Sequence, residues 1–187
     1  MRVEWRAAFA AATLLCGLAL MGCAGAGAGA GAGPSDRLTE RALRQVLDDI
    51  ERDANALRLD TLRAVLANDA EISMRTTATG RPQTLRFSRE EYLSQSEAVL
   101  EDLRAGGVRY ESRSTPPQLR ITPDGLSAVA TATTLDTYRH PDGRQVDTSS
   151  RSIVHFVHRD GATLIDTIEV FDETAPVGVP PSPPDVR

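Results

Sequence analysis

The stretch NALRLDTLRAVLANDAEI, residues 55–72, changes its hydrophobic period part-way along. Its first half has apolar residues at helical spacing, which predicts a short helix over residues 60–67 that ends at Asn68-Asp69. From residue 70 onward the pattern alternates instead, with one face made of Ile72, Met74 and Thr76. Alternation is typical of a strand with one buried face. The stretch therefore predicts a short helix that leads directly into a strand.

Two longer helices are predicted on either side of this unit. The first is capped by Ser35 or Asp36 and carries an apolar stripe from Leu38 to Leu57. After a turn at residues 79–82 and a short strand at residues 84–88, Ser88-Arg89-Glu90-Glu91 forms a capping box, which opens the second helix. Gly106-Gly107 is expected to end that helix.

The remainder of the chain, from Val108 to Asp172, predicts an antiparallel sheet. The alternating segments are residues 108–115, 118–122, 126–138, 145–158 and 162–172. Pro116-Pro117 separates the first two, so residues 118–122 are expected to be an edge strand or a bulged continuation. Pro123-Asp124-Gly125, the loop at residues 140–144 and Arg159-Asp160-Gly161 are predicted turns. With the helices grouped on one face, the fold class is α+β.

This order of elements resembles the nuclear transport factor 2-like superfamily, which includes SnoaL-like cyclases, ketosteroid isomerases and scytalone dehydratase. The resemblance covers about residues 36–172 and is carried by the opening stretch and by GATLIDTIEVFD at residues 161–172. It implies a curved antiparallel sheet wrapped around about three helices, forming a cone with a pocket at its open end.

The resemblance also places the three polar groups that the isomerases of this superfamily use. By ungapped alignment, the tyrosine, the carboxylate base and the protonated aspartate fall on Ile50, Met74 and Val154. That chemistry needs a base and two donors beside an apolar cavity, and apolar side chains supply none of them. We therefore predict no catalytic residues and an apolar cone, whose expected lining is Ile50, Met74, Tyr92, Tyr110, Ser152, Val154 and Phe156.

The other polar candidates do not form a reactive group in the sequence. His155 and His158 are three residues apart on a strand, so they are expected to face opposite sides and not to share a metal ion. Asp166 lies near Ile165 and Ile168 and is expected to be buried and to pair with an arginine of a neighbouring strand rather than to act in catalysis. No cofactor and no metal site are predicted. The outer face of the sheet, with Ile153, His155 and Val157, is a candidate homodimer interface.

The N-terminus predicts the location of the protein. MRVEWR and an apolar run over residues 7–21 fit a signal peptide over residues 1–22 and are short for a membrane span. Leu20-Met21-Gly22-Cys23 resembles the lipobox of bacterial lipoproteins, in which the cysteine thiol receives lipid. Cys23 is therefore the expected anchor in the cell envelope, and Ala24 favours the periplasmic face of the outer membrane. Cys23 and the Ala-Gly run over residues 23–35 would form a flexible linker.

These features predict a folded domain over residues 36–173 and a proline-rich, disordered tail over residues 174–187. All 21 basic residues are arginine and the net charge is −5, without a basic stripe, so nucleic acid is not an expected partner. The only other cysteine, Cys16, lies in the signal peptide. The favoured function is a lipid-anchored envelope protein that binds an apolar small molecule or a protein partner. The alternatives are an isomerase, dehydratase or cyclase of the same fold, and a dimeric assembly module.

Overall fold

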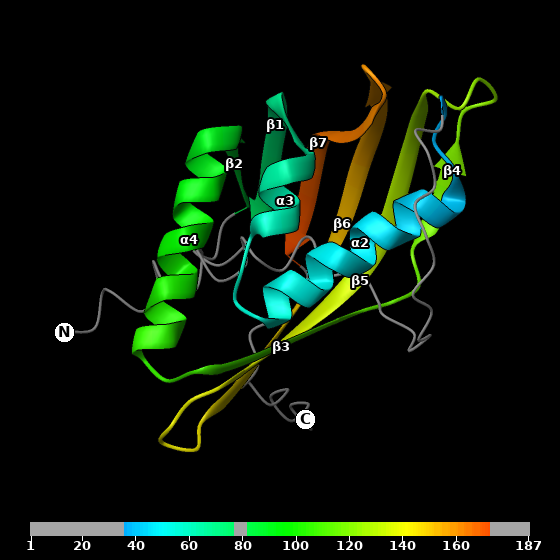
Figure 1. Cartoon of the computed structure of the whole chain (residues 1–187). Coiled ribbons are helices and arrows are strands. Elements are labelled where there is room, and N and C mark those ends of the chain that lie inside the picture. The colour runs from blue at the N-terminus through cyan, green and yellow to red at the C-terminus, as the bar shows by residue number, and fades with distance from the viewer. Residues whose placement is uncertain (1–35, 77–81, 173–187) are drawn as a thin grey trace, which may run out of the picture.

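The computed structural model describes residues 36–76 and 82–172 (Figure 1). The signal peptide, Cys23, the Ala-Gly linker and the proline-rich tail lie outside the described residues, as does most of the turn at residues 79–82. Within residues 36–76 and 82–172, no helix is long and apolar enough to cross a membrane.

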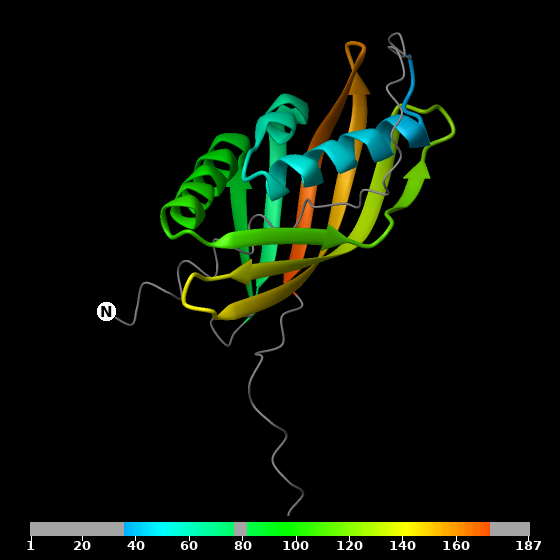
Figure 2. The same ribbon diagram turned by 60° about the horizontal axis from the view of Figure 1, so that its bottom comes forward.

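In the described part of the chain, three helices lie on one face of a seven-stranded sheet (Figure 1). The helices are α2 (Glu40–Asn55), α3 (Asp60–Val65) and α4 (Arg89–Ala105). The strands are β1 (Leu66–Thr76), β2 (Gln83–Ser88), β3 (Arg109–Ser114), β4 (Gln118–Ile121), β5 (Ser127–Arg139), β6 (Gln145–Arg159) and β7 (Ala162–Asp172). This arrangement confirms the predicted α+β class, with a curved sheet whose concave face holds the helices (Figure 2).

The strand order is β2-β1-β7-β6-β5-β3, so β2 and β3 form the two ends of the sheet. β4 also pairs with β5 and continues the line of β3 beyond Pro116-Pro117, as the sequence predicts for residues 118–122. All pairs are antiparallel except β1 with β7, which is parallel. The prediction of an antiparallel sheet is therefore wrong at this one pair, where two strands distant in the sequence lie side by side.

The boundaries of two helices differ from the sequence prediction. α2 begins at Glu40, capped by the Thr39 hydroxyl, which accepts a hydrogen bond from Ala42 N, and not by Ser35 or Asp36. The segment just before α2 contacts the turn at Gly125. Leu38 is buried there, and its N–H donates to the Gly125 carbonyl at 2.8 Å.

The end of α3 also differs. The helix ends at Val65, because Leu66 already pairs with Ile165 in β7. A register shift between Leu66 and Glu71 keeps the exposed Asn68 and Asp69 within β1, where the sequence predicts a helix end.

The other predicted signals are in place. Ser88 and Glu91 form the reciprocal capping box of α4. Gly107 follows that helix at φ 60°, a conformation that glycine adopts without strain. The concave face then buries alternate side chains of β5 and β6, which pack with the helices into one large apolar core.

Candidate functional site

The concave face is filled where the sequence analysis places the cone lining. Ile50, Met74 and Val154 are 2%, 0% and 0% exposed and belong to one continuous apolar cluster with Tyr92 and Phe156. Ser152 is also fully buried, and its Oγ has no hydrogen-bond partner. The three positions that carry the isomerase groups in the resembled family therefore lie in close-packed core.

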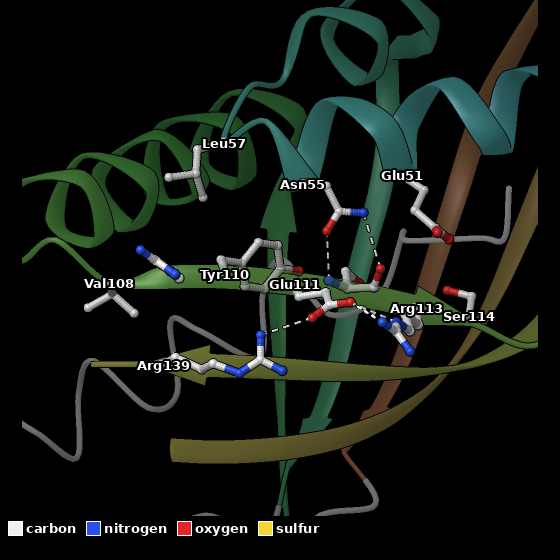
Figure 3. A pocket seen from close by; sticks show the side chains of 11 residues that line it. Glu51, Asn55, Leu57, Val108, Tyr110, Glu111, Arg113, Ser114 and Arg139 are labelled. Atoms are coloured by element: carbon white, nitrogen blue, oxygen red, sulfur yellow. Dashed lines mark hydrogen bonds and ion pairs between the residues drawn. The ribbon is translucent and has the colours of Figure 1, made fainter. Parts of the chain in front are cut away.

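Tyr110 lies in a different place from the other predicted lining residues. Its ring packs on Tyr138 with the centroids 5.2 Å apart, in a small cluster with Ala54. Tyr110 borders a cavity of about 930 Å³ between the C-terminal end of α2 and strand β3 (Figure 3). Of the seven predicted lining residues, it is the one on this cavity.

The cavity follows the open edge of β3. All six residues of β3 line it, together with Val108, which precedes the strand. Successive side chains of a strand point to opposite faces, so a cavity lined by every residue in turn runs along the strand rather than over one face. The residues that complete the wall are Glu51, Asn55, Leu57 and Arg139.

Asn55 bridges the cavity by binding the backbone of β3. Its Nδ2 donates to the Ser112 carbonyl at 3.1 Å, and the Ser112 N–H donates to its Oδ1 at 2.7 Å. Figure 3 shows this side chain pointing from α2 to the strand. Both backbone groups of Ser112 are thus directed away from β5, into the cavity.

Arginines predominate on the outer face of β3. Arg113 and Arg139 both bind Glu111, through Arg113 Nε at 2.8 Å and Arg139 Nη1 at 3.1 Å. Hydrogen bonds from Arg113 and then from Arg139 hold the pKa of the Glu111 carboxyl below its usual range. Arg109 lies directly opposite Arg139 in the sheet register, and within the described part of the chain it has no ion pair. We call Arg109, Glu111, Arg113 and Arg139 the arginine rim; its three cations and one anion leave an excess of two positive charges.

The inner face of β3 is polar and buried. The Tyr110 hydroxyl donates to Asp136 Oδ1 at 2.6 Å, and Asp136 is 0% exposed. The hydroxyls of Ser114 and Thr134 are 2.9 Å apart, and Ser112 Oγ is buried without a hydrogen-bond partner. These side-chain hydrogen bonds connect the inner faces of β3 and β5 behind the cavity.

His155, His158 and Asp166 do not line this cavity. His155 is half-buried on the outer face, with Nε2 3.7 Å from Glu169 Oε1. Asp166 is half-buried at a bulge of β7 and lines, with His155 and Phe156, a second cavity of about 260 Å³. Its Oδ1 has no hydrogen-bond partner, and within residues 36–76 and 82–172 no arginine forms an ion pair with it, so the expected pairing is not seen. Over those same residues, no three His, Cys, Asp or Glu side chains could jointly hold a metal ion.

Comparison with known proteins gives matches in structure alone. No protein-family model matches the sequence, and no curated protein sequence matches it. A hexachlorocyclohexane dehydrochlorinase from Novosphingobium barchaimii superposes with a TM-score of 0.56 at 16% identity, over 80% of this chain and 98% of that one. An uncharacterized protein with a cystatin-like fold from Caulobacter vibrioides gives 0.54 at 18% identity, over 72% and 89% of the two chains.

A third match is a protein described by its fold. A nuclear transport factor 2-like protein of unknown function from Pseudomonas putida superposes with a TM-score of 0.53 at 16% identity, over 71% of this chain and 84% of that one. The fold is nuclear transport factor 2-like. This confirms the resemblance for the fold. One of these three matches is an enzyme, and the other two are proteins of unknown function. The fold by itself therefore assigns no activity.

The sequence analysis missed most of the β3 cavity. Tyr110 is expected in the lining of the cone, and it lies on this cavity instead. Asn55 and Ser112 are 57 positions apart, and a bond between a side chain and a distant backbone leaves no local pattern. The alternation Arg109-Glu111-Arg113 on the exposed face was the one available sign.

Proposed function

We propose that this chain is a lipid-anchored cell-envelope protein that binds a protein partner along the edge of β3. The observation that carries the proposal is the cavity of about 930 Å³ lined by all six residues of that strand and by the preceding Val108. A groove beside an unpaired strand edge is a surface that another polypeptide can use.

The core argues for a site at the edge rather than inside the cone. Ile50, Met74 and Val154 belong to one apolar cluster, and each side chain is 2% exposed or less. This packing leaves no room for a ligand at those positions. The β3 groove is lined by two glutamates and three arginines. Of the two ligands that the sequence predicts, an apolar small molecule and a protein partner, these charges favour the protein partner.

Attachment to the envelope rests on the Leu20-Met21-Gly22-Cys23 motif and on the Ala-Gly linker that follows it. Labelled palmitate should enter the wild-type protein and should not enter Cys23→Ser. Wild-type protein that is unlabelled and soluble in the periplasm would show that the anchor is wrong, while leaving the groove to be tested separately.

A photo-reactive amino acid in the groove tests the binding function. We expect Glu111 replaced by such a residue to cross-link a partner in intact cells, and the same residue at Thr84, on the opposite edge strand β2, not to do so. The partner identified by mass spectrometry should then bind the purified domain, and Arg139→Gln should weaken that binding. Equal cross-linking at both positions, or none at Glu111, would contradict the proposal.

A homodimer through the outer sheet face is the second candidate. No helix of the described chain covers that face, and Leu135, 50% exposed, shares it with the half-buried Ile153 and Val157. Sedimentation equilibrium would give a dimer mass for the wild type and a monomer mass for Ile153→Asp. A monomeric wild type at high concentration would remove this candidate.

A further inference from the structure

We propose that the partner binds as an extended, acidic peptide that adds an antiparallel strand to β3 and displaces the Asn55 side chain. This inference rests on the proposed binding function and specifies the mode and the chemistry of the partner.

The side chain of Asn55 imitates a neighbouring strand. At each hydrogen-bonded position of an antiparallel pair, the two opposite residues exchange both of their backbone hydrogen bonds. The carboxamide of Asn55 makes this same pair of bonds with Ser112, accepting at 2.7 Å and donating at 3.1 Å. Asn55 therefore occupies the position of one peptide unit of a neighbouring strand.

Strand addition would exchange one set of hydrogen bonds for another. A peptide residue opposite Ser112 would replace the two bonds that Asn55 gives up. The amide of Asn55, which is an exposed residue, would regain its bonds from water. The net free energy of a hydrogen bond in water is small, so this exchange changes the binding free energy little. The affinity is therefore determined by side-chain contacts and by the neighbouring backbone hydrogen bonds.

The charges of the arginine rim favour an acidic peptide. Arg109 and Arg113 lie four residues apart on the same face of β3, about 13 Å along a strand that rises ~3.3 Å per residue. Arg109 and Arg139 are directly opposite each other, and like charges in that arrangement repel. Glu111 offsets this repulsion at Arg139 only, so an added anion beside Arg109 would be favourable. Glu111, between the two arginines of β3, is already bound by Arg113 and Arg139. The rim thus suits acidic side chains at two positions with a neutral residue between them.

These arguments define a probe, acetyl-Val-Asp-Val-Thr-Val-Asp-Val-amide. Aligned antiparallel, its two aspartates stand opposite Arg113 and Arg109, its threonine opposite Glu111, and its third residue opposite Ser112. Its valines face the inner side, where Leu57 and Val108 supply apolar surface. The control probe carries lysine in place of both aspartates.

Binding of the probe to the soluble domain, followed by fluorescence anisotropy, tests the charge argument. Arg109→Gln should weaken binding about two- to fivefold, the size typical of an exposed ion pair, and added salt should weaken it further. Arg86→Gln, an exposed arginine on the opposite edge strand β2, should leave affinity unchanged. The lysine probe should not bind. Equal affinity for the two probes would overturn the acidic partner.

The Asn55 variant tests displacement. Asn55→Ala should tighten binding about fivefold, because the peptide no longer competes with an internal amide. Asn68→Ala, an exposed asparagine on β1, is the matched control and should not change affinity. Thermal melts of both variants show that they are folded. Weaker binding by a folded Asn55→Ala would overturn displacement.

N-methylated probes test strand addition directly. A methyl group on the third residue's nitrogen removes a bond to Ser112 and should abolish binding, whereas one on the fourth residue points away from β3 and should be tolerated. Equal effects of the two methyl groups would overturn the strand mode. If no probe binds but the cross-linked partner still binds the groove, this inference is wrong and the proposed function stands; if neither binds, both are wrong.

Discussion

At the level of single residues, substitution of Met74 tests whether the concave face is tightly packed. Its side chain is fully buried, whereas the neighbouring Arg75 is exposed, with its guanidinium carbon 5.1 Å from the centroid of the Phe171 ring. We expect Met74→Asp to destabilise the domain by several kcal/mol, because a carboxylate in apolar surroundings has no partner. Arg75→Asp should cost much less, since it loses only a surface contact.

The cost of Met74→Asp should depend on pH. Burial raises the pKa of the new carboxyl above its ordinary value of about 3.9. The penalty is therefore smallest below about pH 4, where the acid is neutral in both states, and grows as the pH rises. Urea unfolding of both variants from pH 4 to pH 8 measures it. A penalty independent of pH, or equal costs at the two positions, would place Met74 outside the core.

Tyr110 anchors β3 to β5 behind the groove. Its hydroxyl is the donor to the buried Asp136, so Tyr110→Phe should cost about 1–3 kcal/mol by leaving that acceptor short of a hydrogen bond. In an Asp136→Ala background the same change should cost clearly less, because the two residues act as a pair. Calorimetric or urea stabilities of the four proteins give the coupling. Additive costs would mean that the bond contributes nothing.

At the scale of elements, Asp53 holds the connection between α2 and α3. It is buried and accepts hydrogen bonds from Thr61 N at 2.9 Å, Thr61 Oγ1 at 2.7 Å and Arg58 Nη2 at 2.8 Å. Burial acts to raise its pKa, but the bonds from Thr61 and Arg58 outweigh it and bring the pKa below the usual range.

This lowered pKa predicts acid sensitivity of the α2–α3 connection. A carboxyl with a depressed folded-state pKa stabilises the fold above its unfolded pKa of about 3.9, and that stability is lost as the pH falls through the folded-state pKa. Asp53→Asn should therefore lose less stability than the wild type between pH 7 and pH 3, as measured by urea unfolding at each pH. The same loss in both proteins would mean that Asp53 is not the group responsible.

The sequence predicts elements well where one face of an element is buried. β5, β6 and β7 lie within a residue of the predicted segments, because alternation reports directly which face meets the core. It fails at β1, where pairing of Leu66 with Ile165 extends the strand into a segment of helical pattern. It also fails at the groove, because nothing near Asn55 in the sequence indicates that its amide meets Ser112. Contacts between distant segments decide both cases.

At the scale of the whole molecule, the folded unit should be independent of its flanks. The Ala-Gly linker and the proline-rich tail offer little apolar surface to bury. A fragment of residues 36–173 should therefore melt cooperatively at nearly the temperature of a soluble form of residues 24–187. A difference of many degrees in scanning calorimetry would show that a flank packs on the domain.

The protein as a whole would combine a lipid anchor, predicted at Cys23, with a groove at the end of the sheet opposite β2. A filled core beneath the helices leaves the β3 edge, with its arginine rim and the Asn55 amide, as the surface for recognition. The central claim is that a second polypeptide hydrogen-bonds to this edge.

The most direct test is nuclear magnetic resonance of the ¹⁵N-labelled domain, titrated with the acidic heptapeptide. The account predicts that the largest shifts of backbone amide signals fall on β3 and centre on Ser112. The Asn55 side-chain amide should move to the position of a solvent-exposed group, and β2 should be unaffected. Saturating peptide that leaves Ser112 and Asn55 unshifted, or that shifts β2 as strongly as β3, would contradict it.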